Sequence, residues 1–254
     1  MRVEGESPRR EPLFRVSRQA FHSMIDIHAH ILPGMDDGPS TSEEALEMAR
    51  IAVANGIGVI VATPHCLNGV YNNWRKEILS ACAQFNAELN RHDIPLTVLP
   101  GSEVRLSPEI IDALDSGRLM TMNDAGQHIT LELPDQFVPG ATISFINRLR
   151  GRGITPIISH PERNPAIQHN VALLSDIIAA GALSQITAAS FTGGFGQGAL
   201  KCCQRILALR LVDFVASDAH SSKKRPPVLN APDDRLALLT RKAHIQKMLG
   251  ETLN

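Results

Sequence analysis

Histidines and carboxylates follow several short apolar runs of the chain, at spacings that could build a metal site. The sequence H-A-H places His28 and His30 on one side of an extended strand, because side chains alternate with a period of two residues. The candidate ligands are nine in all: His28, His30, Asp36, His65, Glu103, Glu132, His160, Asp218 and His220. Imidazole and carboxylate together suit Zn, Mn or Fe. Because this set is too large for one tetrahedral ion, it indicates two or three ions with a carboxylate such as Glu103 as a bridge.

Clustered ions polarise a phosphoryl oxygen and supply hydroxide at neutral pH, so this set favours metal-assisted hydrolysis of a phosphoester. Each member alone has a simpler explanation. His28 and His30 could be a hydrogen-bonded surface pair, Asp36–Asp37–Gly38 a capped turn, and Glu103 a carboxylate that merely ends a strand. The recurrence of such side chains at the ends of successive apolar runs favours one shared site.

The sequence HCLNGVYNNWR, residues 65–75, raises a different possibility, a cysteine-based phosphatase loop. Such a loop needs an arginine six positions after the cysteine, and that position holds Asn72; the first arginine is Arg75. It also lacks the glycine-rich turn that would fold backbone N–H groups around an anion. We therefore expect His65 to be a ligand and Cys66 a bystander, although a thiolate could also bind a soft metal.

The elements that would position these residues alternate along the chain. Short apolar runs occupy residues 24–28, 58–63, 96–104, 129–134, 154–159, 184–190 and 212–217. Amphipathic segments between and after them predict helices near residues 43–56, 74–92, 107–117, 141–152, 166–180, 197–210 and 233–249, the first opening with a capping-box-like S-E-E-A at Ser42. This alternation predicts an α/β barrel of about seven parallel strands. An open doubly wound sheet is the alternative, but no glycine-rich dinucleotide fingerprint follows the first run.

A barrel of parallel strands brings all the carboxyl ends of its strands to one face, where active sites lie. The nine candidates would meet there. The remaining histidines fall away from expected strand ends and are assigned no site role: His22, His92, His128, His169 and His244.

Composition limits the class of protein. The chain has 254 residues, is 43% hydrophobic and carries a net charge of −1, which argues against a general nucleic-acid or anionic-membrane surface. Four cysteines without a CxxC pair fit a reducing compartment, so a cytoplasmic protein is expected. No window is long and apolar enough for a membrane span. Residues 1–23 are rich in arginine and read as a flexible leader, ahead of one domain at residues 24–254.

Six ordered motifs together resemble the PHP (polymerase and histidinol phosphatase) superfamily: DIHAHILPGMDDG (26–38), ATPH (62–65), GSEV (101–104), LELP (131–134), SHPER (159–163) and SDAH (217–220). The resemblance extends over about residues 24–249 and is strongest to the bacterial capsule-type, manganese-dependent protein tyrosine phosphatases. It implies a distorted (β/α)7 TIM-like barrel. It also implies a phosphotyrosine phosphatase that acts on the tyrosine-rich tail of a bacterial kinase controlling capsular or exopolysaccharide synthesis, with no membrane insertion of its own.

The resemblance also implies roles for single residues. One ion would be held by His28, His30 and Asp218, sharing Glu103 with a second ion that also takes Glu132 and His160; a third would take Asp36, His65 and His220. The ions would be manganese, with iron or zinc as alternatives, and a metal-bridging hydroxide would attack phosphorus without a covalent enzyme intermediate. Arg163 and Arg225 would contact the phosphate.

Some alternatives stay open at this point. Arg225 could instead belong to a solvated basic run with Lys223 and Lys224. Many relatives carry a second histidine where Cys66 stands, which indicates that this position is not a required ligand. A PHP protein could also hydrolyse a small monoester, as histidinol phosphatases do, act on a nucleic-acid end, or be a non-catalytic scaffold. Balanced charge and few aromatic residues disfavour nucleic acid, and the complete ligand set disfavours the scaffold. The sequence allows a homo-oligomer but does not fix the oligomeric state.

Overall fold

The computed structural model describes residues 24–229, in which strands alternate with helices. The strands are β1 (Met24–Ala29), β2 (Ile57–Ala62), β3 (His65–Cys66), β4 (Thr97–Pro100), β5 (Glu103–Arg105), β6 (His128–Glu132), β7 (Thr155–Ser159), β8 (Leu183–Thr187) and β9 (Phe214–Ala216). The helices are α1 (Ser42–Ala54), α2 (Arg75–Arg91), α3 (Ile110–Asp115), α4 (Thr142–Arg150), α5 (Pro165–His169), α6 (Ala172–Ala179) and α7 (Gly196–Ala208). Short 3₁₀ turns occupy η2 (Met122–Asp124), η3 (Pro161–Arg163) and η4 (Ala188–Thr192). The expected leader, residues 1–23, and the expected helix at 233–249 lie outside the described residues.

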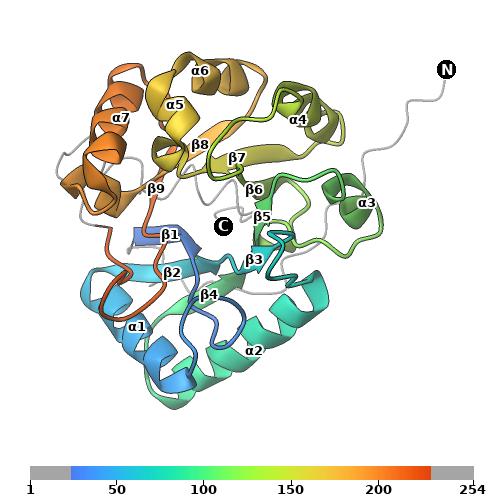
Figure 1. The fold of residues 1–254 in the computed structure, drawn as a ribbon. Helices are drawn as coiled ribbons and strands as arrows, with labels where there is room; N and C mark the ends of the chain where they lie inside the picture. The colour runs from blue at the N-terminus through green and yellow to red at the C-terminus, as the bar shows by residue number, and fades with distance from the viewer. Residues whose placement is uncertain (1–23, 230–254) are drawn as a thin grey trace, which may run out of the picture.

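The strands form two sheets in which every pair is parallel, so the predicted α/β class is confirmed (Figure 1). One sheet has three strands in the order β1-β2-β4, and the other has six in the order β3-β5-β6-β7-β8-β9. A parallel bridge between Ala29 and Ala219 links the end of β1 to the segment that follows β9. Beside it, the N–H of Asp218 donates to the carbonyl of His28 at 2.9 Å. The first and last described strands therefore meet at their carboxyl ends.

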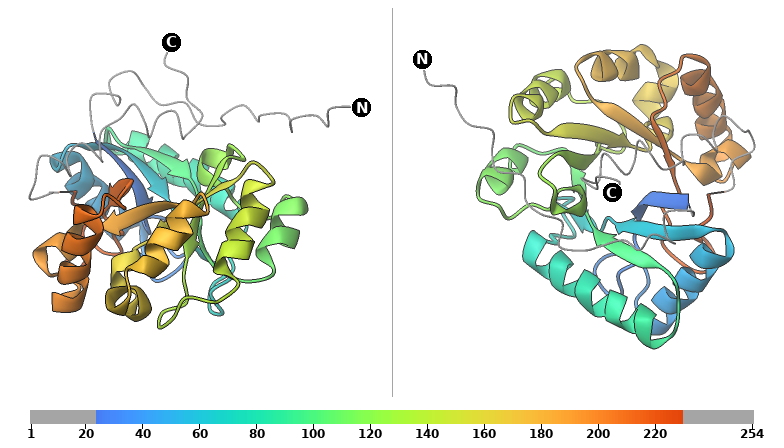
Figure 2. Two further views of the ribbon diagram at one scale, coloured as in Figure 1. Left: turned by 90° about the horizontal axis from the view of Figure 1, so that it is seen from above. Right: turned by 180° about the vertical axis from the view of Figure 1, so that it is seen from behind.

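Helices cover the outer side of both sheets, as the views from above and behind show (Figure 2). An apolar cluster between α1, α2 and the three-stranded sheet includes Met48, Ile60 and Phe85, all at most 2% exposed. A second cluster packs α3 to α7 against the six-stranded sheet. A third joins the strands of both sheets, with Ile27 of β1 and Phe214 of β9 among its members. Burial of apolar side chains on both faces is what these near-continuous hydrophobic strands require.

The expected run at 96–104 is divided into two strands, and this division positions the first residue of the site. β4 pairs with β2 in one sheet, whereas β5 pairs with β3 and β6 in the other. The chain crosses over at Gly101, where an added Cβ would lie 2.7 Å from Val61 Cγ1 and 3.0 Å from the carbonyl oxygen of Ala62. Glycine therefore permits the close approach that delivers Glu103 to the second sheet.

Two helix boundaries also differ from expectation for local reasons. The cap of α1 is Thr41 rather than Ser42, because the Thr41 hydroxyl accepts a hydrogen bond from the N–H of Glu44 at 3.3 Å. The helix expected at 166–180 is broken into α5 and α6, because Asn170 is extended and its side chain accepts from the N–H of Ala172 at 3.2 Å. Asparagine competes in this way with the helical backbone.

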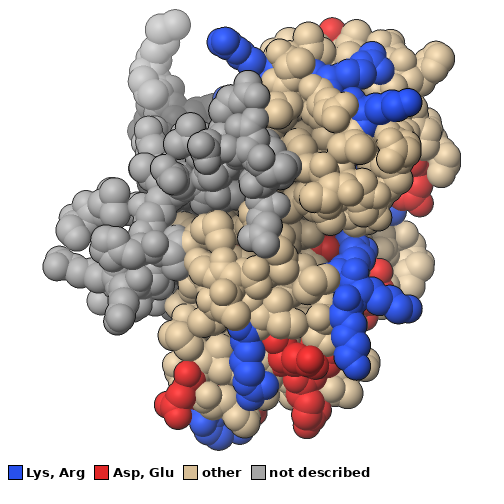
Figure 3. All heavy atoms as spheres, turned by 90° about the vertical axis from the view of Figure 1, so that its left-hand side faces the viewer, with Lys and Arg blue, Asp and Glu red and all other residues tan. Residues whose placement is uncertain are grey.

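The described surface carries both signs of charge. On the face shown in Figure 3, basic and acidic side chains are interspersed among larger neutral areas. None of the helices within residues 24–229 combines the length and the hydrophobicity that a membrane span requires.

Candidate active site

One cavity of about 270 Å³ lies at the carboxyl ends of the strands. Most of the predicted site residues line it: His65, Glu103, Glu132, His160, Arg163, Asp218, His220 and Arg225. His28 and His30 are 0% and 1% exposed and contact the same carboxylates from the protein interior. The loops after different strands thus bring together side chains that are nearly two hundred positions apart in sequence.

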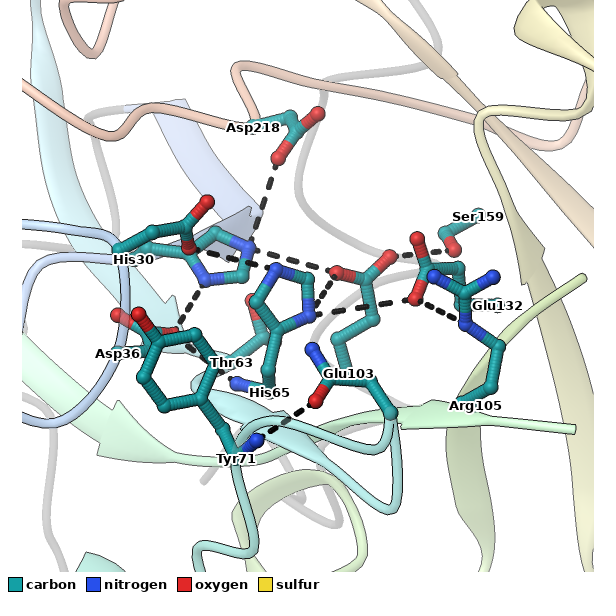
Figure 4. A network of polar contacts seen from close by, with 12 residues as sticks. His30, Asp36, Thr63, His65, Tyr71, Glu103, Arg105, Glu132, Ser159 and Asp218 are labelled. Carbon is teal, nitrogen blue, oxygen red and sulfur yellow. Dashed lines mark hydrogen bonds and ion pairs between the residues drawn. The ribbon is translucent and has the colours of Figure 1, made fainter. Parts of the chain in front are cut away.

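Glu103 is the centre of the cluster (Figure 4). Its Oε2 lies 3.4 Å from Nε2 of both His28 and His30 and 3.2 Å from Nδ1 of His65, while its Oε1 lies 2.8 Å from Nε2 of His160. Burial opposes ionisation of Glu103, but His28 and His160 outweigh it and hold the pKa of this carboxyl well below its usual range. A carboxylate shared by four imidazoles has the placement expected of a bridging ligand.

His28 and His30 present their Nε2 atoms to the same point. These two nitrogens are 3.3 Å apart, and each lies 3.5 Å from Oδ1 of Asp218. Their other ring nitrogens are engaged outside the cluster, Nδ1 of His28 with Gln185 Oε1 at 2.7 Å and Nδ1 of His30 with Asp36 Oδ2 at 2.6 Å. Because both outer partners are acceptors, Nδ1 would donate its hydrogen to them and Nε2 would be the atom that binds a metal ion.

The two aspartates of the D-D-G sequence have different positions. Asp36 bonds to His30, and it also accepts from the backbone N–H groups of Gly38 and His65 at 3.0 Å. Asp37 Oδ1 instead lies 3.4 Å from Nε2 of His65 and 3.4 Å from Nε2 of His220. The group close enough to hold one ion is therefore His30, Asp37, His65 and His220. This candidate group contains Asp37 and not the predicted ligand Asp36, whose carboxylate contacts Nδ1 of His30 instead.

Glu132 and His160 complete the other side of the cluster. Nε2 of His160 lies 3.9 Å from Glu132 Oε1, and Nδ1 of His65 lies 4.0 Å from Glu132 Oε2. Burial and the neighbouring Glu103 raise the pKa of Glu132 to about 7. Arg105 approaches from outside, with its Nε 3.0 Å from Glu132 Oε2. Sequence reasoning did not identify Arg105, although it lies two positions after Glu103.

Two residues of the cluster have left-handed backbone conformations that residues other than glycine seldom adopt. The φ angles are 35° at His160 and 51° at Asp218. Such conformations cost on the order of 1–3 kcal/mol and persist where surrounding structure requires them. Here each one directs a side chain into the cavity at the point where its strand ends.

Buried groups beneath the cluster fix the strand ends. Asp26 is fully buried and accepts from the N–H and the hydroxyl of Ser217, at 3.0 and 2.5 Å, which ties β1 to the loop carrying Asp218. Ser159 donates to Glu103 Oε1 at 2.6 Å. Sequence analysis gave no site role to Asp26, Ser159 or Gln185. The even spacing of Asp26 with His28 was the one available signal.

The two predicted arginines lie together at the cavity wall. Nη2 of Arg163 and Nη2 of Arg225 donate to the same oxygen, Asp218 Oδ2, at 2.5 and 2.6 Å. Lys223 and Lys224 are exposed, whereas the Arg225 side chain is only 32% exposed. Arg225 thus differs from the neighbouring lysines, because its side chain is partly buried and contacts Asp218. Asp218 uses Oδ1 toward the histidines and Oδ2 toward the arginines.

Cys66 faces the protein interior, as predicted for a bystander. It is 0% exposed within the apolar cluster beneath the six-stranded sheet, and burial raises the pKa of its thiol to about 12. A neutral, buried thiol is a poor nucleophile. His92, His128 and His169 lie outside the three candidate ligand groups found within residues 24–229.

The residues present fit divalent metal ions. His65 Nδ1 is buried and makes no hydrogen bond, and it faces two carboxylate oxygens, Glu103 Oε2 at 3.2 Å and Glu132 Oε2 at 4.0 Å. Two imidazole Nε2 atoms also face each other at 3.3 Å. Burial lowers the pKa of His28, but the charges of Glu103 and Asp218 more than offset it and raise the pKa overall. A cation would take the place of that proton, and imidazole with carboxylate is a donor set for Zn, Mn or Fe.

This chain belongs to the capsular polysaccharide synthesis family CpsB/CapC, whose model matches residues 24–251. It is 45% identical over 202 residues to the tyrosine-protein phosphatase YwqE of Bacillus subtilis, covering 80% of this chain and 79% of YwqE. It is 27% identical over 219 residues to the tyrosine-protein phosphatase CpsB of Streptococcus pneumoniae, covering 84% of this chain and 90% of CpsB.

Solved structures agree with these relatives. YwqE and CpsB have crystal structures, reported as those of metal-dependent tyrosine phosphatases. A chain from these structures matches the present chain with a TM-score of 0.79 and 40% sequence identity, covering 90% of this chain and 88% of the matched chain. A histidinol phosphate phosphatase from Lactococcus lactis, solved with zinc, L-histidinol and phosphate, matches with a TM-score of 0.51 and 14% identity over 91% of this chain and 95% of the other. The second likeness concerns the fold alone.

Proposed function

We propose that this chain is a metal-dependent tyrosine phosphatase, a phosphoric monoester hydrolase of capsular or exopolysaccharide synthesis. The observation that carries the proposal is a single cavity in which a histidine–carboxylate cluster lies beside two arginines. The identity to YwqE, 45% over 202 residues, supports phosphotyrosine as the substrate.

Two or three manganese ions would be held by this cluster, with iron or zinc as alternatives. One ion would take His28, His30 and Asp218; a second would take Glu132 and His160; a third would take His65, His220 and, in place of Asp36, Asp37. Glu103 would be shared between ions, which its contacts with four histidines support. When bound, the ions supply Lewis-acid polarisation of the phosphoryl group and a hydroxide nucleophile at neutral pH.

The chain's own residues would orient the substrate. The guanidinium groups of Arg163 and Arg225 would donate to phosphoryl oxygens, because planar forks match that geometry and line the cavity here. Asp218 would hold both guanidiniums through Oδ2 while Oδ1 faces the histidines. The leaving tyrosine oxygen has a pKa of about 10, so it departs more readily than an alkoxide. No cysteine nucleophile is required, in keeping with the buried Cys66 thiol.

We further propose that both sheets are parts of one distorted (β/α)7 barrel of the PHP type, formed by residues 24–254 as a single domain. The bridge between Ala29 and Ala219 supports it, since it joins β1, at the edge of one sheet, to the segment that follows β9, at the edge of the other. The direct passage of the chain from β4 to β5 supports it on the other side. The leader, residues 1–23, would precede this domain.

The proposed partner is the phosphotyrosine tail of a bacterial tyrosine kinase, reached from the cytoplasm. The family description, capsular polysaccharide synthesis, supports that context. Four free cysteines, all buried, support a reducing compartment. Nucleic acid is not a proposed ligand, because the net charge is −1.

The second candidate is a phosphatase of a small monoester, because the ligand cluster and the two arginines of the cavity would bind the phosphate of any monoester. Manganese-loaded protein should be assayed on a phosphotyrosine peptide and on histidinol phosphate in parallel. We expect kcat/KM for the peptide to be higher by on the order of 100-fold. Asp218→Ala is the control, since it should abolish both activities if both arise at this site. Equal or faster hydrolysis of histidinol phosphate would favour the second candidate.

Replacing either arginine should impair phosphate recognition without removing metal. We expect Arg163→Ala and Arg225→Ala each to lower kcat/KM. The loss corresponds to ~2–4 kcal/mol of transition-state stabilisation, comparable to the loss of one oxyanion donor. Metal content measured by mass spectrometry should match that of the unmodified protein. The control is Lys224→Ala, an exposed neighbour that should change kcat/KM by less than about twofold. If kcat/KM of Arg225→Ala is within twofold of the unmodified protein, Arg225 does not contact the phosphate and belongs to the solvated basic run with Lys223 and Lys224.

A further inference from the structure

The aromatic ring of Phe195 lies against both arginines of the cavity wall. The guanidinium carbon of Arg163 is 4.5 Å from the centre of this ring, and that of Arg225 is 5.3 Å from it. The three residues come from different segments: η3 after β7, the start of α7 after β8, and the loop after β9. Phe195 itself is not among the residues that line the cavity. The ring therefore contacts the two arginines without being part of the cavity wall.

Glycines on either side of Phe195 form the backbone turn that carries this residue. Gly193 and Gly196 have φ angles of +83° and +85°, which side chains with a Cβ rarely adopt. The turn is closed by the N–H of Gly194 donating to Ala189 and by the N–H of Gly196 donating to Gly193, both at 2.9 Å. Phe195 is thus held at the cap position of α7 by a defined turn.

The two guanidiniums need such support because they carry like charges. Both reach the same oxygen, Asp218 Oδ2, and the Nε atoms of both are buried without a hydrogen-bond partner. An aromatic face attracts a guanidinium through its quadrupole and leaves the N–H groups at the edge free to donate. One ring that contacts both cations offsets part of their repulsion and limits their rotamers. The N–H groups that remain can then be directed toward an anion in the cavity.

We propose that Phe195 is a positioning residue that holds Arg163 and Arg225 ready for a phosphoryl group, and so sets the affinity for tetrahedral phosphate. This inference rests on the proposed function of the two arginines. Phe195 acts on oxyanion binding, not on metal binding, because its ring contacts the two arginines and it belongs to none of the candidate ligand groups in the described part of the chain.

The test uses inorganic phosphate as the probe and the manganese-loaded protein. In Phe195→Leu the dissociation constant of phosphate, measured by calorimetry, should rise about fivefold to tenfold, as expected for the loss of two partly desolvated cation–π contacts. KM for a phosphotyrosine peptide should rise in proportion, while kcat changes less than about twofold. Metal content should be unchanged. Phe195→Tyr keeps the aromatic face, so it should bind phosphate with the affinity of the unmodified protein.

Phe191→Leu is the matched control. Phe191 lies four positions earlier and packs against the two apolar clusters under the helices, so the same change of side chain there should alter thermal stability and leave phosphate affinity unchanged. If Phe195→Leu binds phosphate as tightly as the unmodified protein, the inference is wrong. It is also wrong if only the peptide KM rises while phosphate affinity holds, because Phe195 would then contact the substrate's own ring. Unmodified protein that neither binds phosphate nor hydrolyses the peptide would instead overturn the proposed function.

Discussion

Glu103→Gln should abolish turnover of a phosphotyrosine peptide, with kcat/KM lower by more than about 10³-fold, the upper end for loss of one oxyanion donor. The carboxylate is 1% exposed and lies within 3.4 Å of His28, His30, His65 and His160. An amide of the same shape keeps the packing but removes the negative charge that would be shared between cations. Metal content should fall with activity, because every proposed ion depends directly or through a neighbour on this residue.

The control for Glu103→Gln is Glu162→Gln, a second fully buried carboxylate of the same region. Glu162 accepts from the N–H of Thr187 and the hydroxyl of Ser190 through one oxygen, and an amide oxygen can keep both bonds. The metal content of the Glu162→Gln variant should equal that of the unmodified protein. Glu103→Gln with full metal content and full activity would show that the cluster is not the catalytic centre.

His65→Ala should lose nearly all activity, whereas Cys66→Ser should keep most of it. His65 contributes to two of the candidate ligand groups and contacts Glu103 at 3.2 Å. The adjacent Cys66 thiol points into the apolar core, and its pKa is raised to about 12 by burial. Serine at position 66 places a hydroxyl in that core, so we expect a lower melting temperature without a large change in kcat/KM.

The outcome that contradicts this prediction is equally specific. Cys66→Ser with normal metal content and no activity, together with a trapped phosphocysteine in the unmodified protein, would replace the metal mechanism with a thiol mechanism. Thiol alkylation of the folded protein should accordingly have little effect on turnover.

Much of the fold is predictable from local pattern, and the exceptions have local causes. Each of the seven apolar runs overlaps a strand, because buried parallel strands require short stretches of apolar residues. The division at Gly101 was not predictable, since a passage between sheets depends on contacts with Val61 and Ala62 from another strand. The break at Asn170 depends on a side-chain hydrogen bond that the amphipathic pattern of α5 and α6 does not encode.

The site was predictable to the extent that ligand types recur at strand ends. The choice between Asp36 and Asp37 was not, because adjacent carboxylates look alike in sequence and only the turn decides which one faces His65 and His220. Arg225 could not be separated from Lys223 and Lys224 without its contact to Asp218. Phe195 had no signal of its own, since its partners lie 32 and 30 positions away and carry no shared periodicity.

The most direct test of metal-dependent hydrolysis is the activity of one protein sample before chelation, after chelation and after manganese is returned. Metal content and hydrolysis of a phosphotyrosine peptide should be measured on the same aliquots. We expect activity to disappear as metal is removed and to return in proportion to the manganese bound, with two or three ions per chain at full activity. Metal-free protein that still hydrolyses the peptide at the original rate would contradict the account.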